Sequence, residues 1–205
     1  MTEIKIILEG EHEKEVQDKD SKLALIYKRS CSNVYFIKGE KNIIFDTGNR
    51  YVKEKLVKAL EENNINPDEV DYVIQSHWHL DHCSNIHLFK NAKIVSGKRF
   101  IWFPDGGAEK YRKTEDMDIA GVKIINTEGH VQSHISALVE IDGENHIISG
   151  DAIRKDYMEE GFFKNEEAKE TAIKILKIAD VIYPGHGKVI QKEKIKKLLE
   201  MAQSK

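Results

Sequence analysis

Four residues with metal-binding side chains lie within six positions of one short stretch. They are His77, His79, Asp81 and His82, in the run Ser-His-Trp-His-Leu-Asp-His-Cys-Ser-Asn. On an extended segment His77 and His79 point to the same side, because side chains alternate along a strand. A helix that begins near Asp81 would turn Asp81 and His82 back toward a neighbouring point. Imidazole and carboxylate groups suit zinc and iron, so the two pairs could serve two adjacent ions.

Two metal sites need more than four ligands, and three further candidates follow downstream. His130, Asp151 and His186 each follow a predicted strand and have a glycine beside them. A neighbouring glycine lets the backbone turn sharply and approach an ion closely. Loops at strand ends are also where rigid scaffolds usually carry chemistry. These positions therefore supply the additional ligands that a pair of sites requires.

The elements that must position these residues are short strands with amphipathic helices between them. Hydrophobic periodicity predicts helices over 51–63, 165–179 and 192–203, with Asn165 as the N-cap of the second. The predicted strands cover 4–8, 23–27, 34–37, 42–45, 70–75, 93–96, 117–120, 122–125, 135–141, 146–149 and 181–183. Two strand-rich halves, each with helices on one side, suit two packed sheets with helices outside, while periodicity alone supports a mixed α/β domain.

Two long connections lie outside these elements. The charged run 9–22 is expected to be a solvated loop or hairpin connection, with His12 exposed to water. The segment from Gly97 to Lys113 combines four aromatic residues with basic ones and has Pro104 and two glycines near its centre. One interpretation is a surface loop anchored in the core by an aromatic side chain. The other is a mobile flap over the metal site whose aromatic residues wall the substrate pocket.

Length and composition describe one globular domain over residues 1–205. The chain is 40% hydrophobic and 33% charged, with a net charge of −3 from 32 basic and 35 acidic residues. That balance argues against a nucleic-acid partner, although a local basic groove is compatible with it. No stretch approaches the ~20 apolar residues of a membrane span. Two cysteines make no disulfide framework and the N-terminus does not resemble a signal peptide, so we expect a cytoplasmic protein with no membrane contact. The sequence gives no indication of oligomeric state.

The ligand candidates have the order and spacing of a known superfamily. From about Asn33 to Gly187 the chain resembles the metallo-β-lactamase superfamily, whose five motifs are matched in order. The first motif corresponds to Asp46 in Phe45-Asp46-Thr47-Gly48, and the others correspond to His77-x-His79-x-Asp81-His82, His130, Asp151 and His186. Weaker similarity points to the small single-domain branch of metallo-β-lactamase domain-containing protein 1.

The resemblance implies a four-layer αββα sandwich with two metal ions at one edge between the sheets. One ion would be held by His77, His79 and His130. The other would be held by Asp81, His82 and His186, and Asp151 would bridge both ions. The expected cofactor is two Zn²⁺, with iron or manganese as alternatives.

Two further residues are expected to support this site. Asp46 is either a turn-capping carboxylate or a support for the metal ligands. His134 follows His130 by four residues and could contact a ligand or the substrate. With Asp81 and Asp151, these two complete our set of candidate catalytic residues.

The resemblance also implies a reaction. A metal-bridged hydroxide would attack a carbonyl or phosphorus centre while the ions stabilise the developing anion. We expect a hydrolase that acts on a small-molecule ester, thioester or lactone. A phosphodiesterase or nuclease, and an iron-dependent dioxygenase, use the same ligands and remain alternatives.

Overall fold

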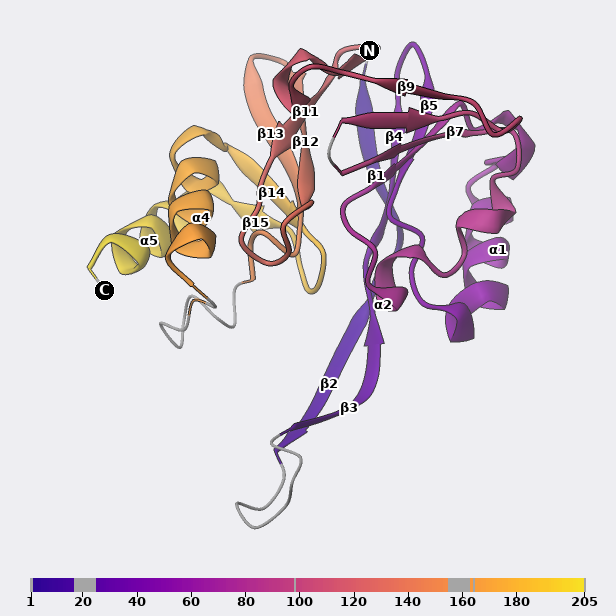
Figure 1. Cartoon of the computed structure of the whole chain (residues 1–205). Helices are drawn as coiled ribbons and strands as arrows, with labels where there is room; N and C mark the ends of the chain where they lie inside the picture. Colours follow the sequence, from indigo (N-terminus) through magenta and orange to yellow (C-terminus); the bar gives the residue numbers. More distant parts are fainter. Residues whose placement is uncertain (1, 17–24, 98, 155–162, 164, 205) are drawn as a thin grey trace.

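The computed structural model describes residues 2–16, 25–97, 99–154, 163 and 165–204. Two β-sheets face each other at its centre, and helices cover their outer faces (Figure 1). The layers therefore follow the order helix, sheet, sheet, helix, which confirms the four-layer αββα sandwich. None of the described helices is long and apolar enough to cross a membrane.

The first sheet has seven strands in the order β1-β4-β5-β6-β7-β8-β9. Strands β5, β6 and β7 run parallel, and the strands on either side are antiparallel to their neighbours. The strand bounds are β1 Glu3–Leu8, β4 Val34–Lys38, β5 Asn42–Phe45, β6 Tyr72–Gln75, β7 Lys93–Ser96, β8 Phe100–Trp102 and β9 Ala108–Lys110.

The second sheet has six strands in the order β10-β11-β12-β13-β14-β15. Only the pair β13 and β14 is parallel. The strand bounds are β10 Asp118–Ile119, β11 Val122–Asn126, β12 Ile135–Ile141, β13 Glu144–Gly150, β14 Val181–Pro184 and β15 Ile190–Gln191.

Alternating side chains divide the apolar interior into three layers. On β4, Tyr35 and Ile37 face the second sheet, while Val34 and Phe36 pack toward helix α1 (Lys53–Glu62). On β13, Ile148 faces the inner core, whereas Ile147 packs against the helices of the second sheet. Those helices are α4 (Glu166–Ile178) and α5 (Lys192–Gln203). Central strands such as β4 and β5 thus bury both faces, because one faces a sheet and the other a helix.

Most of the expected elements are confirmed. The strands at 42–45, 93–96 and 135–141 and the helix at 192–203 match to the residue. Asn165 caps α4, since its side chain accepts a hydrogen bond of 2.8 Å from the amide of Ala168. The helix expected over 51–63 begins as a short 3₁₀ turn, Arg50–Val52, and continues as α1. Further short 3₁₀ turns cover Pro67–Glu69, Ile86–Leu88 and Thr114–Asp116.

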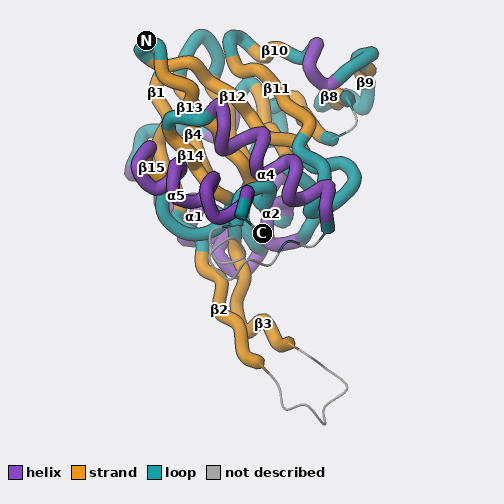
Figure 2. Tube along the Cα trace, turned by 90° about the vertical axis from the view of Figure 1, so that its left-hand side faces the viewer, coloured by secondary structure: helices purple, strands orange, loops and turns teal. Residues whose placement is uncertain are grey.

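A two-stranded hairpin stands away from the sandwich. It consists of β2 (Glu11–Val16) and β3 (Leu25–Cys31), which pair only with each other. The described part of the charged run 9–22, expected to be a solvated loop or hairpin connection, therefore forms most of the first arm of this hairpin, and residues 17–22 lie outside the described residues. Figure 2 shows the hairpin projecting from one end of the molecule. Its base lies at the sheet edge described next, and its first strand carries His12.

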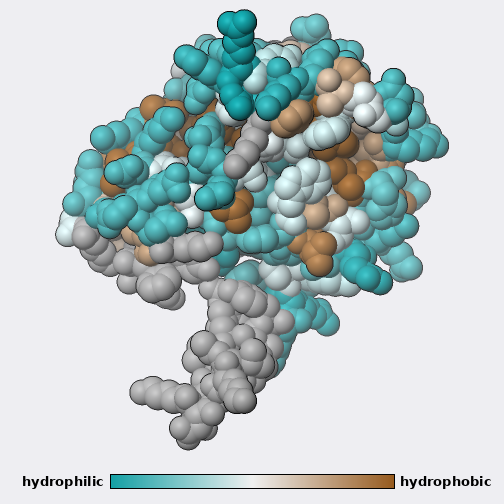
Figure 3. Space-filling model, viewed as in Figure 1, coloured by the Kyte–Doolittle hydropathy of each residue, from teal (hydrophilic) through white to brown (hydrophobic). Residues whose placement is uncertain are grey.

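Hydrophilic residues cover most of the face shown in Figure 3, and the hydrophobic residues there form small groups. This surface agrees with the high charged fraction of the sequence.

Candidate metal centre

The candidate ligands meet because parallel strands of both sheets end at the same edge. Asp46 directly follows β5, and Ser76 and His77 follow β6. In the second sheet, Asp151 directly follows β13 and His186 lies two residues after β14. The two sheets are joined at this edge by a hydrogen bond of 3.0 Å from the amide of Ile135 to the carbonyl of Ser76. Residues that are far apart in sequence are thereby brought to one point.

The central motif changes conformation between its two pairs of ligands. His77 follows β6, His79 has extended backbone, and helix α2 (Leu80–Cys83) begins immediately afterwards, with His79 as its N-cap. The helix turns His82 back, and its amide donates to the carbonyl of His79 at 2.9 Å. This confirms the expectation that a helix near Asp81 redirects the second pair.

The first expected ligand set is present. The ligand atoms of His77, His79 and His130 all lie within 4.8 Å of one another. His79 Nδ1 is 2.8 Å from His77 Nε2 and 3.1 Å from His130 Nε2. His77 is buried, whereas His79 is exposed and His130 partly exposed, so this set opens to solvent on one side.

The second expected set is also present. Asp81, His82 and His186 bring one ligand atom each to within 4.8 Å of the other two. His186 Nε2 is 3.6 Å from Asp81 Oδ2. His82 is fully buried, and its ring centroid is 5.2 Å from that of His186.

Asp151 lies between the two sets, with one oxygen toward each. Its Oδ2 is 3.6 Å from His130 Nε2, and its Oδ1 is 3.5 Å from both His82 Nε2 and His186 Nε2. Three of these buried atoms, His82 Nε2, His186 Nε2 and Asp151 Oδ1, have no hydrogen-bond partner among the described residues. Buried polar atoms are rarely left without a partner, and lone pairs that converge in this way suit a cation. The donor set therefore fits metal ions.

Asp46 and Ser76 determine which ring nitrogens are available as ligands. Asp46 Oδ2 is 2.7 Å from His82 Nδ1 and accepts the hydroxyl proton of Ser76 at 2.8 Å. Ser76 Oγ therefore accepts from His77 Nδ1, at 3.0 Å. Both Nδ1 atoms thus carry protons, which leaves the Nε2 atoms free to bind an ion. Asp46, which is buried, fits the expectation that it supports the ligands, and its catalytic role stays a prediction.

His134 fixes the backbone of the bridging residue. It is fully buried, its Nε2 accepts a hydrogen bond of 3.2 Å from the Asp151 amide, and its Nδ1 is 2.8 Å from Thr127 Oγ1. No room remains for a side chain at the adjacent Gly150, since a Cβ there would lie 3.0 Å from His134 Nε2. The geometry makes His134 a positioning residue for Asp151, and direct substrate contact stays a prediction.

Burial and nearby charge set the protonation of the site. Burial lowers the pKa of His130 to about 4 and that of His134 to about 3. Burial alone would raise the pKa of Asp151, but the imidazoles of His82, His186 and His130 hold it well below its usual range. For His82, burial acts to lower the pKa, yet the carboxylates of Asp151 and Asp46 raise it to about 9. A cation bound at His82 Nε2 would displace the proton held there.

Several residues at this edge were not recognised in the sequence. Asn33 is buried and donates to Tyr35 Oη at 2.8 Å and to the carbonyls of Pro184 and Gly187 at 2.9 Å each. It therefore clamps the start of β4 to the turn that carries His186. The signal that could have revealed it is its position at the start of the stretch that resembles the superfamily.

His12 contradicts the expectation of a solvated side chain. It is partly buried, and its ring centroid lies 4.9 Å from that of His186. Its Nε2 is 3.0 Å from an Nη2 atom of Arg154, and its Nδ1 is 3.0 Å from Ser30 Oγ. The reason is the hairpin, whose base brings β2 and β3 over the second ligand set.

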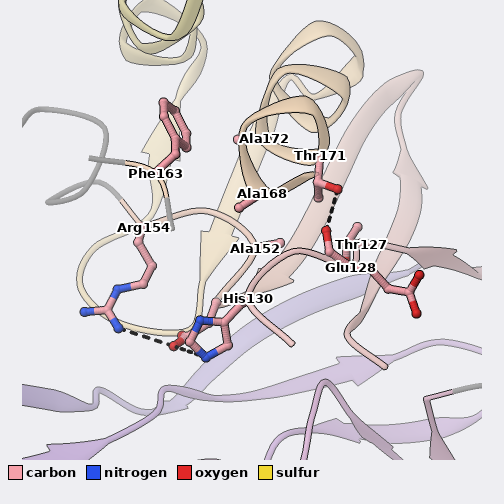
Figure 4. A pocket seen from close by; sticks show the side chains of 10 residues that line it. Thr127, Glu128, His130, Ala152, Arg154, Phe163, Ala168, Thr171 and Ala172 are labelled. Carbon is pink, nitrogen blue, oxygen red and sulfur yellow. Dashed lines mark hydrogen bonds and ion pairs between the residues drawn. The ribbon is translucent and has the colours of Figure 1, made fainter. Parts of the chain in front are cut away.

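Two cavities adjoin the ligands. The larger, of ≈ 560 Å³, is open to solvent and lined by His79, Asp81, His130 and Asp151 on one side and by hairpin residues on the other. The smaller, of ≈ 30 Å³, lies behind His130 next to α4. Figure 4 shows the side chains of His130 and Arg154 close together on one side of this smaller cavity. Both contact the carboxylate of Asp151.

The described part of the segment from Gly97 to Lys113 lines neither of these two cavities, and the flap interpretation stays a prediction. This part forms β8 and β9, which extend the first sheet. Phe100 pairs with Ser96 at the metal edge, and Trp102 pairs with Ile94 toward the opposite edge. The turn that follows places Pro104 beside Tyr72, at the far end of β6. Ile101 is buried in the inner core, which fits the alternative interpretation of an anchored surface segment.

Comparison with known proteins agrees with this geometry. The family described as the metallo-beta-lactamase superfamily matches residues 29–186. The chain belongs to this superfamily. It is 31% identical to a probable metallo-hydrolase of Methanocaldococcus jannaschii over 159 residues, which cover 75% of this chain and 74% of that protein. It is 28% identical to metallo-beta-lactamase domain-containing protein 1 of Xenopus laevis over 163 residues, or 76% and 70% of the two chains.

Solved structures share the fold. A Thermotoga maritima protein described as a candidate metallo-beta-lactamase superposes with a TM-score of 0.69 at 22% identity, over 93% of this chain and 99% of that one. A chemotaxis sensor solved as a peroxy diiron species gives a TM-score of 0.62 at 17% identity, over 85% and 87%. Together with the matched family, the relatives make this chain a member of a metallo-hydrolase superfamily with a candidate His/Asp metal cluster.

Proposed function

We propose that this protein is a dinuclear metal-dependent hydrolase that cleaves a small ester, thioester or lactone. The observation that carries the proposal is the position of Asp151, whose two oxygens each face a separate set of imidazoles at 3.5 to 3.6 Å. A carboxylate shared in this way is what a two-ion site requires.

The ligand chemistry supports zinc, with iron or manganese as alternatives, because imidazole and carboxylate donors suit all three. His77, His79 and His130 would hold one ion, and Asp81, His82 and His186 the other, with Asp151 between them. Such a pair would supply a water of pKa near ~7 and polarise the bond to be cleaved.

The residues of the chain define how a substrate would enter and lie. The buried side of the site, with His77 and His82, is closed to solvent, so water and substrate approach past His79 and His130. The ≈ 560 Å³ cavity on that side is of the size that small molecules occupy in proteins. Leu80 on the same side offers an apolar contact for the body of the substrate.

A second candidate activity is phosphodiester hydrolysis at the same ligands. Lys28, Arg29 and Arg154 line the large cavity, and cationic side chains beside a metal pair would suit a phosphodiester. The net charge of −3 favours a small substrate over a long nucleic acid.

The test is metal analysis followed by a substrate panel. The purified protein, reconstituted separately with zinc, iron and manganese, is assayed on ester, thioester, lactone and phosphodiester substrates. We expect hydrolysis of a compound from the first three classes, abolished by a chelator and restored by metal. Turnover confined to phosphodiesters would select the second candidate, and oxygen uptake with iron would replace hydrolysis by a dioxygenase reaction.

We also propose a cytoplasmic location. Cys31 and Cys83 are both free thiols, the form that reducing compartments maintain.

A further inference from the structure

The base of the β2–β3 hairpin reaches both carboxylates of the candidate metal centre. His12 of β2 lies against His186, and Ser30 of β3 hydrogen-bonds to Asp81. Arg154, three residues after Asp151, contacts that carboxylate at 3.4 Å and also reaches His12. None of these three residues belongs to the two ligand sets, yet together they connect Asp81 with Asp151.

The direction of every hydrogen bond in this connection follows from its chemistry. A guanidinium group can only donate, so Arg154 Nη2 donates to His12 Nε2 at 3.0 Å. The proton of the neutral imidazole then lies on Nδ1, which donates to Ser30 Oγ at 3.0 Å. Ser30 in turn donates its hydroxyl proton to Asp81 Oδ2 at 2.5 Å.

The oxygen that receives this last bond is the one that faces the second ligand set. Asp81 Oδ2 is 3.6 Å from His186 Nε2. The backbone of Asp81 is fixed separately, because its carbonyl accepts from the amide of Ser32 at 2.9 Å. The hydrogen bond from Ser30 therefore restrains the rotation of the Asp81 carboxylate about its side-chain bonds.

We propose that His12 is a positioning residue for the second metal site, acting through Ser30 on the orientation of Asp81. His12 accepts a hydrogen bond from Arg154 and donates one to Ser30. These bonds link the carboxylate of Asp151, which lies between the two sets, to that of Asp81, which belongs to the second set alone, and each bond has a fixed donor and acceptor. Groups that orient ligands in this way typically change metal affinity or activity by about 10- to 100-fold when removed. The inference rests on the proposed two-ion site, but it requires no particular substrate.

The inference predicts an asymmetric effect of substitution. The bond through which His12 acts ends on Asp81, which belongs to the second set alone, so the first set should keep its affinity. The set that contains Asp81 should lose affinity. Phenylalanine at position 12 keeps a ring of similar shape and removes both hydrogen bonds. Glutamine provides one acceptor and one donor about as far apart as the two ring nitrogens.

The experiment compares His12→Phe, His12→Gln, Ser30→Ala and Ser30→Thr in the full chain. Zn²⁺ binding is measured by competition with a chromogenic chelator, and Co²⁺ binding by the visible ligand-field spectrum. Glu13→Ala is the control, because Glu13 is exposed on the same strand one position from His12. Circular dichroism shows that each variant is folded.

We expect His12→Phe and Ser30→Ala to weaken the second Zn²⁺ by about 10- to 100-fold. The first Zn²⁺ should bind as in wild type, and the Co²⁺ spectrum should change only at the second equivalent. His12→Gln, Ser30→Thr and Glu13→Ala should stay within about threefold of wild type.

Unchanged affinity for the second ion in His12→Phe overturns the inference. Equal losses in His12→Phe and His12→Gln also overturn it, since the ring and not its hydrogen bonds would then matter. These readouts are independent of turnover. A wild-type protein that binds two ions and hydrolyses none of the panel contradicts the proposed function and leaves this inference standing.

Discussion

Two hairpins of this molecule have opposite relations to the metal centre. The base of β2–β3 lies over the second ligand set, with His12 4.9 Å from His186 between ring centroids. The turn of β8–β9 lies at the other end of the first sheet, where Pro104 is beside Tyr72. From the sequence, residues 97–113 could be either a flap or an anchored surface loop, because they lie between ligand motifs, and 9–22 are expected to be a solvated loop or hairpin connection.

Strand direction explains the difference. Strands β5, β6 and β7 end at the metal edge, and β4 is antiparallel to β5, so β4 begins there. Strand β1 is antiparallel to β4 and therefore ends at the same edge. Any insertion between β1 and β4 must leave from the metal edge, whereas β8 runs back from it. Counting strand directions is therefore a better guide to a flap than closeness to a motif.

The largest expected effects on activity come from substitution of the metal ligands themselves. Asp151→Ala removes the carboxylate that faces both ligand sets, and His79→Ala opens the first set. We expect each to lower kcat/KM by about 10³-fold or more, roughly 4 kcal/mol of transition-state stabilisation. Steady-state kinetics with metal analysis tests this, and circular dichroism confirms folding. Near-wild-type turnover in either variant would contradict the role of that residue.

Metal removal should lower the stability of the folded protein. At a free metal concentration ~1,000 times the dissociation constant, each bound ion stabilises the folded state by ~4 kcal/mol. The apoprotein should therefore melt about 10 °C lower or more, and elemental analysis of the reconstituted protein should approach about two ions per chain.

Hydrogen exchange then distinguishes the hairpins. Ser30 is bonded to the ligand Asp81, so amides at the base of β2–β3 should exchange faster without metal. Amides of β8 and β9 pair with β7 and with each other and should keep their protection. If both hairpins lost hydrogen-exchange protection equally, or if the protein bound only one ion at excess metal, the proposed difference between the hairpins would be contradicted.

A smaller effect is expected in the pH dependence of the apoprotein. The folded pKa of His134 is lowered to about 3 by burial, below its unfolded value of roughly 6.5. Its contribution to stability is therefore fully present above pH ~6.5 and is lost as pH falls toward 3, because the unfolded chain binds a proton that the folded chain does not. Between pH 7 and pH 5 this one residue should cost ~2 kcal/mol.

The measurement is chemical denaturation of the apoprotein at pH 7 and pH 5, for wild type and His134→Gln. The variant should lose ~2 kcal/mol less than wild type between the two pH values. His82, whose raised pKa of about 9 acts in the opposite direction above pH ~6.5, is present in both proteins and cancels. Identical pH slopes would show that His134 does not stay neutral when buried. His134 contacts Asp151 at the end of the second sheet and neither hairpin, so this measurement does not bear on the comparison of the hairpins.

The ligands could be predicted from sequence because they are carried by compact local signals. His77, His79, Asp81 and His82 lie within six positions, and Asp151 follows a strand end that periodicity reveals. The αββα layers follow from alternating and 3.6-residue patterns together with the family resemblance.

The surrounding network could not be predicted in the same way. The bond between His12 and Arg154 joins residues 142 positions apart, and neither residue belongs to a recognisable motif. Asn33 acts on a turn 151 residues away. Such contacts depend on how the hairpin base packs on the sheet edge, which is a property of the folded chain and has no periodic signature. Arg154 also resembles an ordinary surface arginine in sequence, although it is buried.

The smallest effect is expected in β8–β9, and it decides the comparison. Trp102 is 43% exposed and stacks on Phe100 at 5.3 Å, at the outer part of the first sheet. Trp102→Ala, and shortening of the turn across Asp105 to Ala108, should leave kcat and KM within about twofold of wild type, since surface changes away from the site have little effect. Ile101→Ala should instead cost ~3 kcal/mol of stability, because it empties part of the inner core, while kcat/KM of the folded fraction stays unchanged. A KM that rises several-fold on shortening the turn, with metal content unchanged, would instead support a flap that closes toward the ligands in solution. Unchanged kinetics here, beside a weakened second ion in His12→Phe, would assign metal positioning to β2–β3 and no role in catalysis to the β8–β9 turn.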